Sequence, residues 1–180
     1  MNFAGTTNYG TVSSAWAFQG TGDFNGDGAA DLLWVNSGAR QVAVWTTRGI
    51  DTPSHGPGIA FPVGWSFQGL GDFNGDGKVD IFWRHTAGAT SAWFMNGTAV
   101  STHAEYGAPS SSWAITGFGD YNADGMTDVF WRNSTTGQTS TWLVRGNTAS
   151  FLPSASVGPT WQTLSINPEG LLIDRCTVPG

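Results

Sequence analysis

The chain is poor in cysteine and in positive charge, and each shortage excludes a class of protein. Its 180 residues contain one cysteine, Cys176, so neither an internal disulfide nor a cysteine-rich zinc cluster can form. Only 7 residues are basic, against 13 acidic ones, and no basic patch of the kind that binds nucleic acid is visible. No apolar run approaches the ~18 residues of a membrane-spanning helix.

The N-terminal residues MNFAGTTNYG also lack the basic and apolar regions of a secretory signal. Either the protein stays where it is made or a signal precedes Met1. What the chain does contain is 26 glycines and 10 tryptophans, with 39% hydrophobic and 11% charged residues. This composition is too aromatic for a disordered chain. Frequent glycine, serine, threonine and valine favour short strands over long helices.

The sequence repeats itself three times with a period of 48 or 49 residues. The segments GDFNGDGAAD, GDFNGDGKVD and GDYNADGMTD begin at Gly22, Gly71 and Gly119. All ten tryptophans keep the same period, in three series. The series are Trp16, Trp65, Trp113 and Trp161; Trp34, Trp83 and Trp131; and Trp45, Trp93 and Trp142. Markers that keep one period indicate true internal repetition.

Each repeat predicts four short strands. A tryptophan opens the first strand, the acidic loop follows, and a second strand such as DIFWR leads through a polar turn to a third. A glycine turn then leads to a weaker fourth strand. Four strands in a unit of this length are typical of a β-propeller blade. A β-sandwich of evenly spaced strands is the alternative, although a sandwich requires no repeated sequence. We therefore expect an all-β, propeller-type fold of four-stranded blades.

The two ends of the chain predict a split fourth unit. The opening residues resemble the end of the second repeat, whereas Trp161 opens a unit that has no acidic loop. The ends can close a four-bladed ring, or the chain can form an open arc whose exposed blade edges invite self-association. We favour the arc. The expected organisation is a single domain over 1–180, with the end of a preceding blade at 1–15, full repeats at 16–64, 65–112 and 113–160, and a partial unit at 161–180.

The acidic loops carry nine of the 13 acidic residues, so the excess of negative charge is local. Each loop has oxygen-bearing side chains at positions 1, 3, 5 and 9 and glycine at position 6, which permits a sharp turn. The backbone carbonyl group at position 7 can add a further oxygen. Hard oxygen ligands in a flexible loop suit Ca²⁺. The predicted ligands are Asp23, Asn25, Asp27, Ala29 and Asp31; Asp72, Asn74, Asp76, Lys78 and Asp80; and Asp120, Asn122, Asp124, Met126 and Asp128.

These loops are not EF-hands, because position 12 holds Trp34, Trp83 or Trp131 instead of a bidentate glutamate. The alternative is a set of ordinary Asp/Asn/Gly turns that connect hairpins. Three carboxylates within nine residues, in three copies, argue against that alternative, because such close charges repel one another unless a cation screens them. We expect about three Ca²⁺ per chain.

The loops and the strands that follow them, such as DVFWRNSTTGQTSTWLV from Asp128 to Val144, resemble FG-GAP/VCBS repeats. These are the repeats of integrin α-subunit propellers and of many secreted bacterial proteins. The resemblance runs from Trp16 to Trp161 and implies a calcium-stapled, usually extracellular propeller that binds or displays ligands. The chain departs from the pattern at Ala123, where the other loops have glycine. It also has fewer full units than such propellers usually contain.

The remaining residues leave several interpretations of function. Recurrent tryptophans are more often packing between blades than sugar platforms, and Arg84 and Arg132 are interpreted as outward strand residues. The three histidines do not recur and no G-x-S-x-G motif is present, so we expect no enzyme. The favoured function is an extracellular recognition or adhesion module with a protein or glycan ligand. A carbohydrate-binding lectin is the alternative, and an accessory part of a polysaccharide-degrading enzyme is a distant one.

Overall fold

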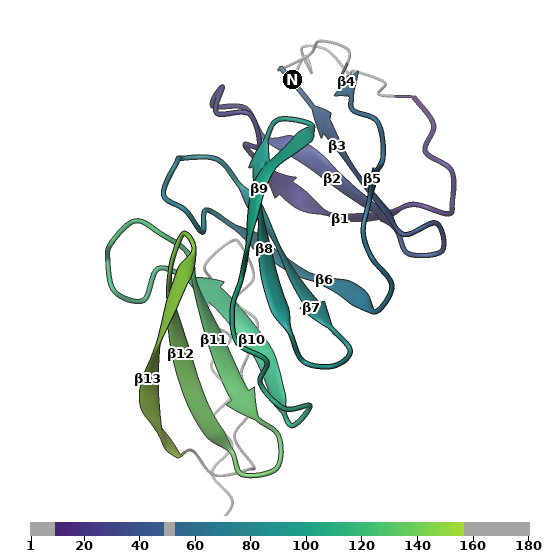
Figure 1. Cartoon of the computed structure of the whole chain (residues 1–180). Coiled ribbons are helices and arrows are strands. Elements are labelled where there is room, and N and C mark those ends of the chain that lie inside the picture. The colour runs from purple at the N-terminus through teal and green to yellow at the C-terminus, as the bar shows by residue number, and fades with distance from the viewer. Residues whose placement is uncertain (1–9, 49–52, 157–180) are drawn as a thin grey trace, which may run out of the picture.

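A computed structural model describes residues 10–48 and 53–156, which form three antiparallel β-sheets and no helix. The sheets follow one another along the chain and lie side by side, as in successive blades (Figure 1). The predicted all-β fold with propeller-type repeats is therefore confirmed. The split fourth unit concerns mainly residues 1–9 and 157–180, which lie outside the described part of the chain.

The second and third sheets each contain four strands in sequence order, paired as neighbours. Each outer strand follows a short glycine turn, which returns the chain antiparallel to the strand before it. The second sheet comprises β6 (Trp65–Gly71), β7 (Asp80–His85), β8 (Thr90–Asn96) and β9 (Ala99–Glu105). The third comprises β10 (Trp113–Gly119), β11 (Asp128–Asn133), β12 (Gln138–Arg145) and β13 (Thr148–Ser156).

The first sheet differs at its outer edge, where two short strands replace the expected fourth strand. Both pair with the third strand of that sheet, so the sheet counts five strands. Pro53 and Pro57 flank the first of these short strands, and proline lacks the N–H that a continuous ladder needs. The strands are β1 (Ala17–Gly22), β2 (Asp31–Asn36), β3 (Gln41–Thr46), β4 (Ser54–His55) and β5 (Ile59–Ala60).

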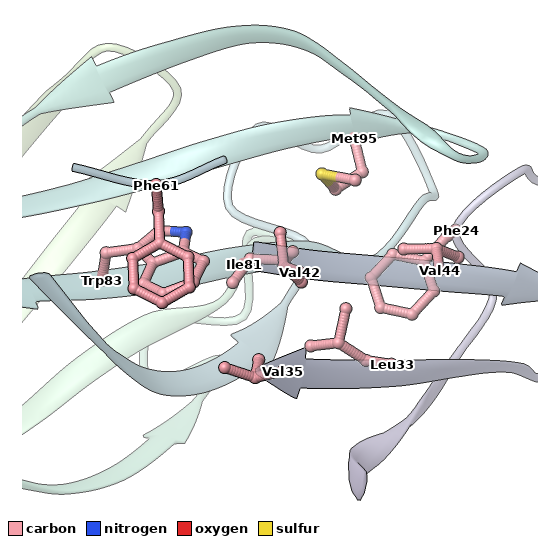
Figure 2. Packing of buried hydrophobic residues seen from close by; sticks show 9 residues of the cluster. All are labelled: Phe24, Leu33, Val35, Val42, Val44, Phe61, Ile81, Trp83 and Met95. Atoms are coloured by element: carbon pink, nitrogen blue, oxygen red, sulfur yellow. The ribbon is translucent and has the colours of Figure 1, made fainter. Parts of the chain in front are cut away.

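Successive sheets pack face to face through two hydrophobic clusters. In the first, Leu33 and Val44 of the first sheet meet Ile81 and Met95 of the second, and all four are at most 1% exposed (Figure 2). The second cluster joins the second and third sheets in the same way, with Phe73, Phe82, Val129 and Val144 fully buried. Burial of each such side chain stabilises the fold by about 1.5–3 kcal/mol. The core therefore lies between the sheets.

The tryptophans of the second strands fill the wedge between neighbouring sheets, as expected for blade packing. Trp83 and Trp131 are buried, and each lies against the tryptophan of the adjacent third strand, with ring centroids 5.0 and 4.8 Å apart. Trp34, the equivalent residue of the first sheet, is only half-buried. No described sheet precedes it, and the neighbouring Phe18 is 52% exposed.

The interpretation of Arg84 as an outward residue is wrong. Its guanidinium group lies between the second and third sheets, 5.1 Å from the centre of the Trp131 ring. It donates hydrogen bonds to the backbone carbonyl oxygens of Trp113, Pro109 and Ser110, the last two at 3.3 and 3.1 Å. Three carbonyl acceptors and an aromatic face compensate the partial burial of the charge.

The equivalent junction between the first and second sheets is lined by different side chains. Val35 stands in place of Arg84, and Phe61, which stands in place of Pro109, packs its ring 4.8 Å from the Trp83 ring. Figure 2 shows Phe61 lying over Trp83. An apolar pair thus replaces a cation and a proline at the same junction. This exchange changes the shape of the junction.

Candidate metal centres

The three acidic loops connect the first and second strands of each sheet and have one shared geometry. In the first loop, Asp23 accepts backbone N–H bonds on both carboxylate oxygens, from Gly26 at 2.6 Å and from Gly28 at 2.7 Å. Asp72 accepts the same bonds from Gly75 and Gly77, at 2.7 and 2.8 Å. The backbone of each loop therefore folds around the carboxylate of the aspartate at position 1.

The side chains at positions 3 and 5 each accept one further hydrogen bond from the loop backbone. Asn25 Oδ1 accepts the N–H of Asp27 at 2.8 Å, and Asp27 Oδ1 accepts that of Ala29 at 2.8 Å. The corresponding bonds occur in the other two loops, at 2.8–2.9 Å. Each of these oxygens uses one lone pair for its bond and retains another that can bind a cation.

The loops need a left-handed backbone at positions 4 and 6. In the first two loops glycine occupies both positions, with φ between 76° and 84°. In the third loop Ala123 takes position 4 at φ 62°, a region that residues with a Cβ seldom adopt. The turn is nevertheless the same, because its side-chain bonds impose it.

The aspartate at position 9 has a second role that the sequence does not reveal. Asp80 is fully buried, and its oxygens accept the N–H groups of Phe73 at 3.0 Å and Met95 at 2.9 Å. Asp31 and Asp128 do the same in their own sheets. Each carboxylate thus ties the loop to the end of the third strand. The partners are backbone N–H groups, which leave no residue signature by which sequence analysis could find them.

The position 9 carboxyl groups carry raised pKa values. Burial raises the pKa of Asp80 to about 7, and the neighbouring charges of Asp76 and Asp72 add to the shift. Burial likewise raises the pKa of Asp31 and of Asp128. A cation held beside such a group would stabilise its ionised form. Without a cation, the surroundings of these carboxyl groups therefore favour the protonated form more than water does.

Lowered pKa values occur at four other loop carboxylates, those of Asp23, Asp76, Asp120 and Asp124. Burial would raise the pKa of Asp23, but the backbone N–H groups of Gly28 and Gly26 outweigh it. The N–H of Met126, and then Arg145, whose Nε lies 2.9 Å from Oδ2, lower the pKa of Asp124. Burial opposes a similar decrease at Asp76, where the N–H and the ammonium group of Lys78 prevail. These groups are ionised at neutral pH.

The oxygen atoms of each loop fit a calcium ion, although the protein supplies only part of the ligands that such an ion needs. Carboxylate, amide and carbonyl oxygens occur in each loop, and these are the ligands that Ca²⁺ prefers. Over residues 10–48 and 53–156, no three acidic, histidine or cysteine side chains form a preformed metal cluster. A cation would therefore take part of its ligands from the asparagine at position 3, the carbonyl group at position 7 and water.

The loops also join neighbouring sheets through backbone hydrogen bonds. The carbonyl group of Asp23 accepts the N–H of Val79 at 2.8 Å, and that of Phe24 accepts the N–H of Gly97 at 2.7 Å. In the next loop, Asp72 and Phe73 accept bonds from Thr127 and Gly146 at 2.6 and 2.9 Å. The approach is close: a Cβ at Gly71 would lie 2.4 Å from the Thr127 side chain. Each acidic loop is therefore also a joint to the following sheet.

Comparison with known proteins places these loops in a family. The model of the FG-GAP-like repeat matches residues 23–83 and 72–131, which together cover more than half of the chain. No curated protein and no solved structure gave a significant match. Such repeats form β-propeller-type modules that often serve recognition or adhesion, and they are typical of extracellular proteins. In the part of the chain that the structure describes, no helix is long and apolar enough to span a membrane. The chain belongs to the family of FG-GAP-like repeat proteins.

Proposed function

We propose that the protein is a calcium-stabilised, extracellular recognition or adhesion module without catalytic activity. The observation that supports this proposal best is the common geometry of the three acidic loops. Every loop gathers carboxylates at positions 1 and 5 next to a buried carboxylate at position 9, whose pKa burial raises. A divalent cation removes the repulsion among such charges.

The direct test of calcium binding is a count of bound ions. We expect about three Ca²⁺ per chain, one for each loop, with the weak affinity of partly exposed extracellular sites. The protein is dialysed extensively against calcium buffer, and bound calcium is measured by elemental analysis against the dialysate. One ion or none would contradict the proposal that the three loops are equivalent sites.

Self-association through the open blade faces is a further expectation of the proposal. The first sheet exposes Phe18, and the acidic loop of the third sheet exposes Tyr121, at 52% and 51%. Both faces correspond to surfaces that are buried where the first sheet meets the second and where the second meets the third. Exposed apolar surfaces of this kind favour association. We expect a dimer or a polydisperse sample in light scattering of the purified chain. A monomer that stays monomeric at high concentration would argue against this expectation.

Carbohydrate binding is the second candidate, and it is favoured by one observation. An aromatic-lined cleft of about 370 Å³ opens between the first and second sheets. Aromatic side chains with polar neighbours are suited to sugar rings, which combine an apolar face with polar edges. A glycan array with calcium present tests this candidate, since only a lectin gives saturable, sugar-competed binding.

A further inference from the structure

The cleft between the first two sheets is a feature that the acidic loops do not explain. Val35, Phe61, Trp65 and Phe67 form its apolar part, while Arg40 and Gln19 contribute polar groups. Its volume of about 370 Å³ lies within the range of roughly 300–1,000 Å³ that is typical of small-ligand sites. It lies at the end of β2 opposite to the acidic loop. Val35 lies four residues beyond Asp31, so about 13 Å of strand separates this part of the cleft from position 9 of the loop.

The first departure from the repeat pattern opens this cleft. Arg84 crosses from the second sheet to the third and bonds the carbonyl groups of Pro109 and Ser110, which precede β10, and of Trp113, which begins it. Val35 is the equivalent residue of the first sheet, and its short side chain reaches none of the corresponding groups. The guanidinium group that closes one junction is therefore absent from the other. Empty volume remains at this junction, and Val35 and Trp65 are among the residues that line it.

The second departure from the repeat pattern places a positively charged side chain, that of Arg40, at the same cleft. Arg40 has φ 52°, although residues with a Cβ rarely adopt this conformation. Glycines take the corresponding turn position in the other repeats, Gly88 at φ 98° and Gly137 at φ 71°. The Arg40 side chain lines the cleft, is exposed and has no hydrogen bond or ion pair with another described residue. A strained arginine where glycine would be relaxed suggests a role in binding.

We propose that this cleft binds an acidic sugar, a hexuronate unit of a polysaccharide. Arg40 pairs with the carboxylate, since a guanidinium group matches a carboxylate in geometry and charge. The aromatic side chains of Trp65 and Phe67 offer surfaces for the C–H face of the sugar ring, and Gln19 and Ser66 are partners for hydroxyl groups. The inference deepens the carbohydrate-binding form of the proposed function and is independent of the calcium sites.

The test compares D-galacturonate with D-galactose, which differ only in the carboxylate at C6. Both are titrated into the full chain in calcium buffer, and binding is measured by calorimetry and by tryptophan fluorescence. We expect galacturonate to bind at least about tenfold more tightly, as is typical for a hydrogen bond to a charged group. Arg40→Gly should remove this preference without lowering the melting temperature, because glycine suits the positive φ.

Two further variants separate the site from general effects. Val35→Arg copies the residue that closes the next junction and should abolish binding of both sugars while the chain stays folded. Arg48→Ala removes an exposed arginine just beyond β3 that does not line the cleft, and it should leave both affinities unchanged.

Each contrary result has a definite meaning. If neither sugar binds, or if Arg40→Gly retains the preference for galacturonate, the proposed site is wrong. If benzoate binds as tightly as galacturonate, the ligand class is wrong, because an aromatic acid lacks the hydroxyl groups. If the chain binds sugars on a glycan array and Val35→Arg does not change that binding, the protein binds carbohydrate at a place other than this cleft, and the proposed site is wrong. None of these outcomes bears on the count of calcium ions.

Discussion

Removal of calcium by a chelator will lower the melting temperature of the protein strongly. Ligand that binds only the folded chain stabilises it by about 2.7 kcal/mol per site when its concentration is 100 times the Kd. Three independent sites would therefore contribute about 8 kcal/mol, which is comparable to the whole stability of a typical domain. Thermal unfolding followed by circular dichroism, with excess calcium and with chelator, measures this difference.

Asp76→Ala tests the assignment of this effect to the loops. The variant should bind one ion fewer and melt at a lower temperature in calcium, but it should approach the wild type in chelator. Trp83 lies three residues beyond Asp80 and should report the change by fluorescence. Glu105→Ala is the matched control, because it removes an exposed acidic residue outside the loops. If chelator leaves the melting temperature of the wild type unchanged, the loops are ordinary turns.

Asp80→Ala will destabilise the protein whether or not calcium is present. The substitution leaves the buried N–H groups of Phe73 and Met95 without their acceptors. An unsatisfied buried donor costs about 1–3 kcal/mol, so we expect a loss of about 2–6 kcal/mol in the free energy of unfolding. Urea denaturation in chelator measures it without any contribution of the ion.

Asp80→Asn separates the hydrogen bonds from the charge. The amide retains one carbonyl oxygen, so the variant can keep one of the two bonds and should lose less stability than Asp80→Ala. The comparison with Asp76→Ala is the decisive one, because that residue is exposed and acts through the ion. Equal stability of Asp80→Ala and wild type in chelator would show that the buried carboxylate has no structural role.

The periodicity of the sequence was sufficient to predict the repeats and their strands. Tryptophan at three places in each unit and glycine before each acidic loop mark the same points of every sheet, so the all-β repeat fold followed from spacing alone. The broken outer edge of the first sheet was not predicted. The prolines around β4 disrupt that strand, and its replacement by two short strands depends on how the connector packs.

The orientation of Arg84 could not be read from the strand pattern. Alternation predicts which residues share a face of a sheet, but both faces of an inner blade are covered by neighbouring blades. A residue that points away from one blade core therefore points into the next junction. The role of Asp80 was hidden for a different reason, since its partners are backbone N–H groups, one in the loop and one in a strand 15 residues away. The cleft depends on Val35 and Phe61 standing in place of Arg84 and Pro109, and a strand pattern does not give the volume that such an exchange leaves.

The backbone bonds between each acidic loop and the following sheet give the array a direction. The carbonyl groups of Asp23 and Phe24 hold the second sheet, and those of Asp72 and Phe73 hold the third. An ion that orders one loop therefore also orders the acceptors on which its successor depends. Within the described part of the chain, the second and third sheets rely on a loop that precedes them, whereas the first relies on none. The donors Val79 and Thr127 are themselves residues of the second and third acidic loops, so each of these bonds couples two calcium sites, and loss of the ion from one loop would weaken binding in its neighbour as well.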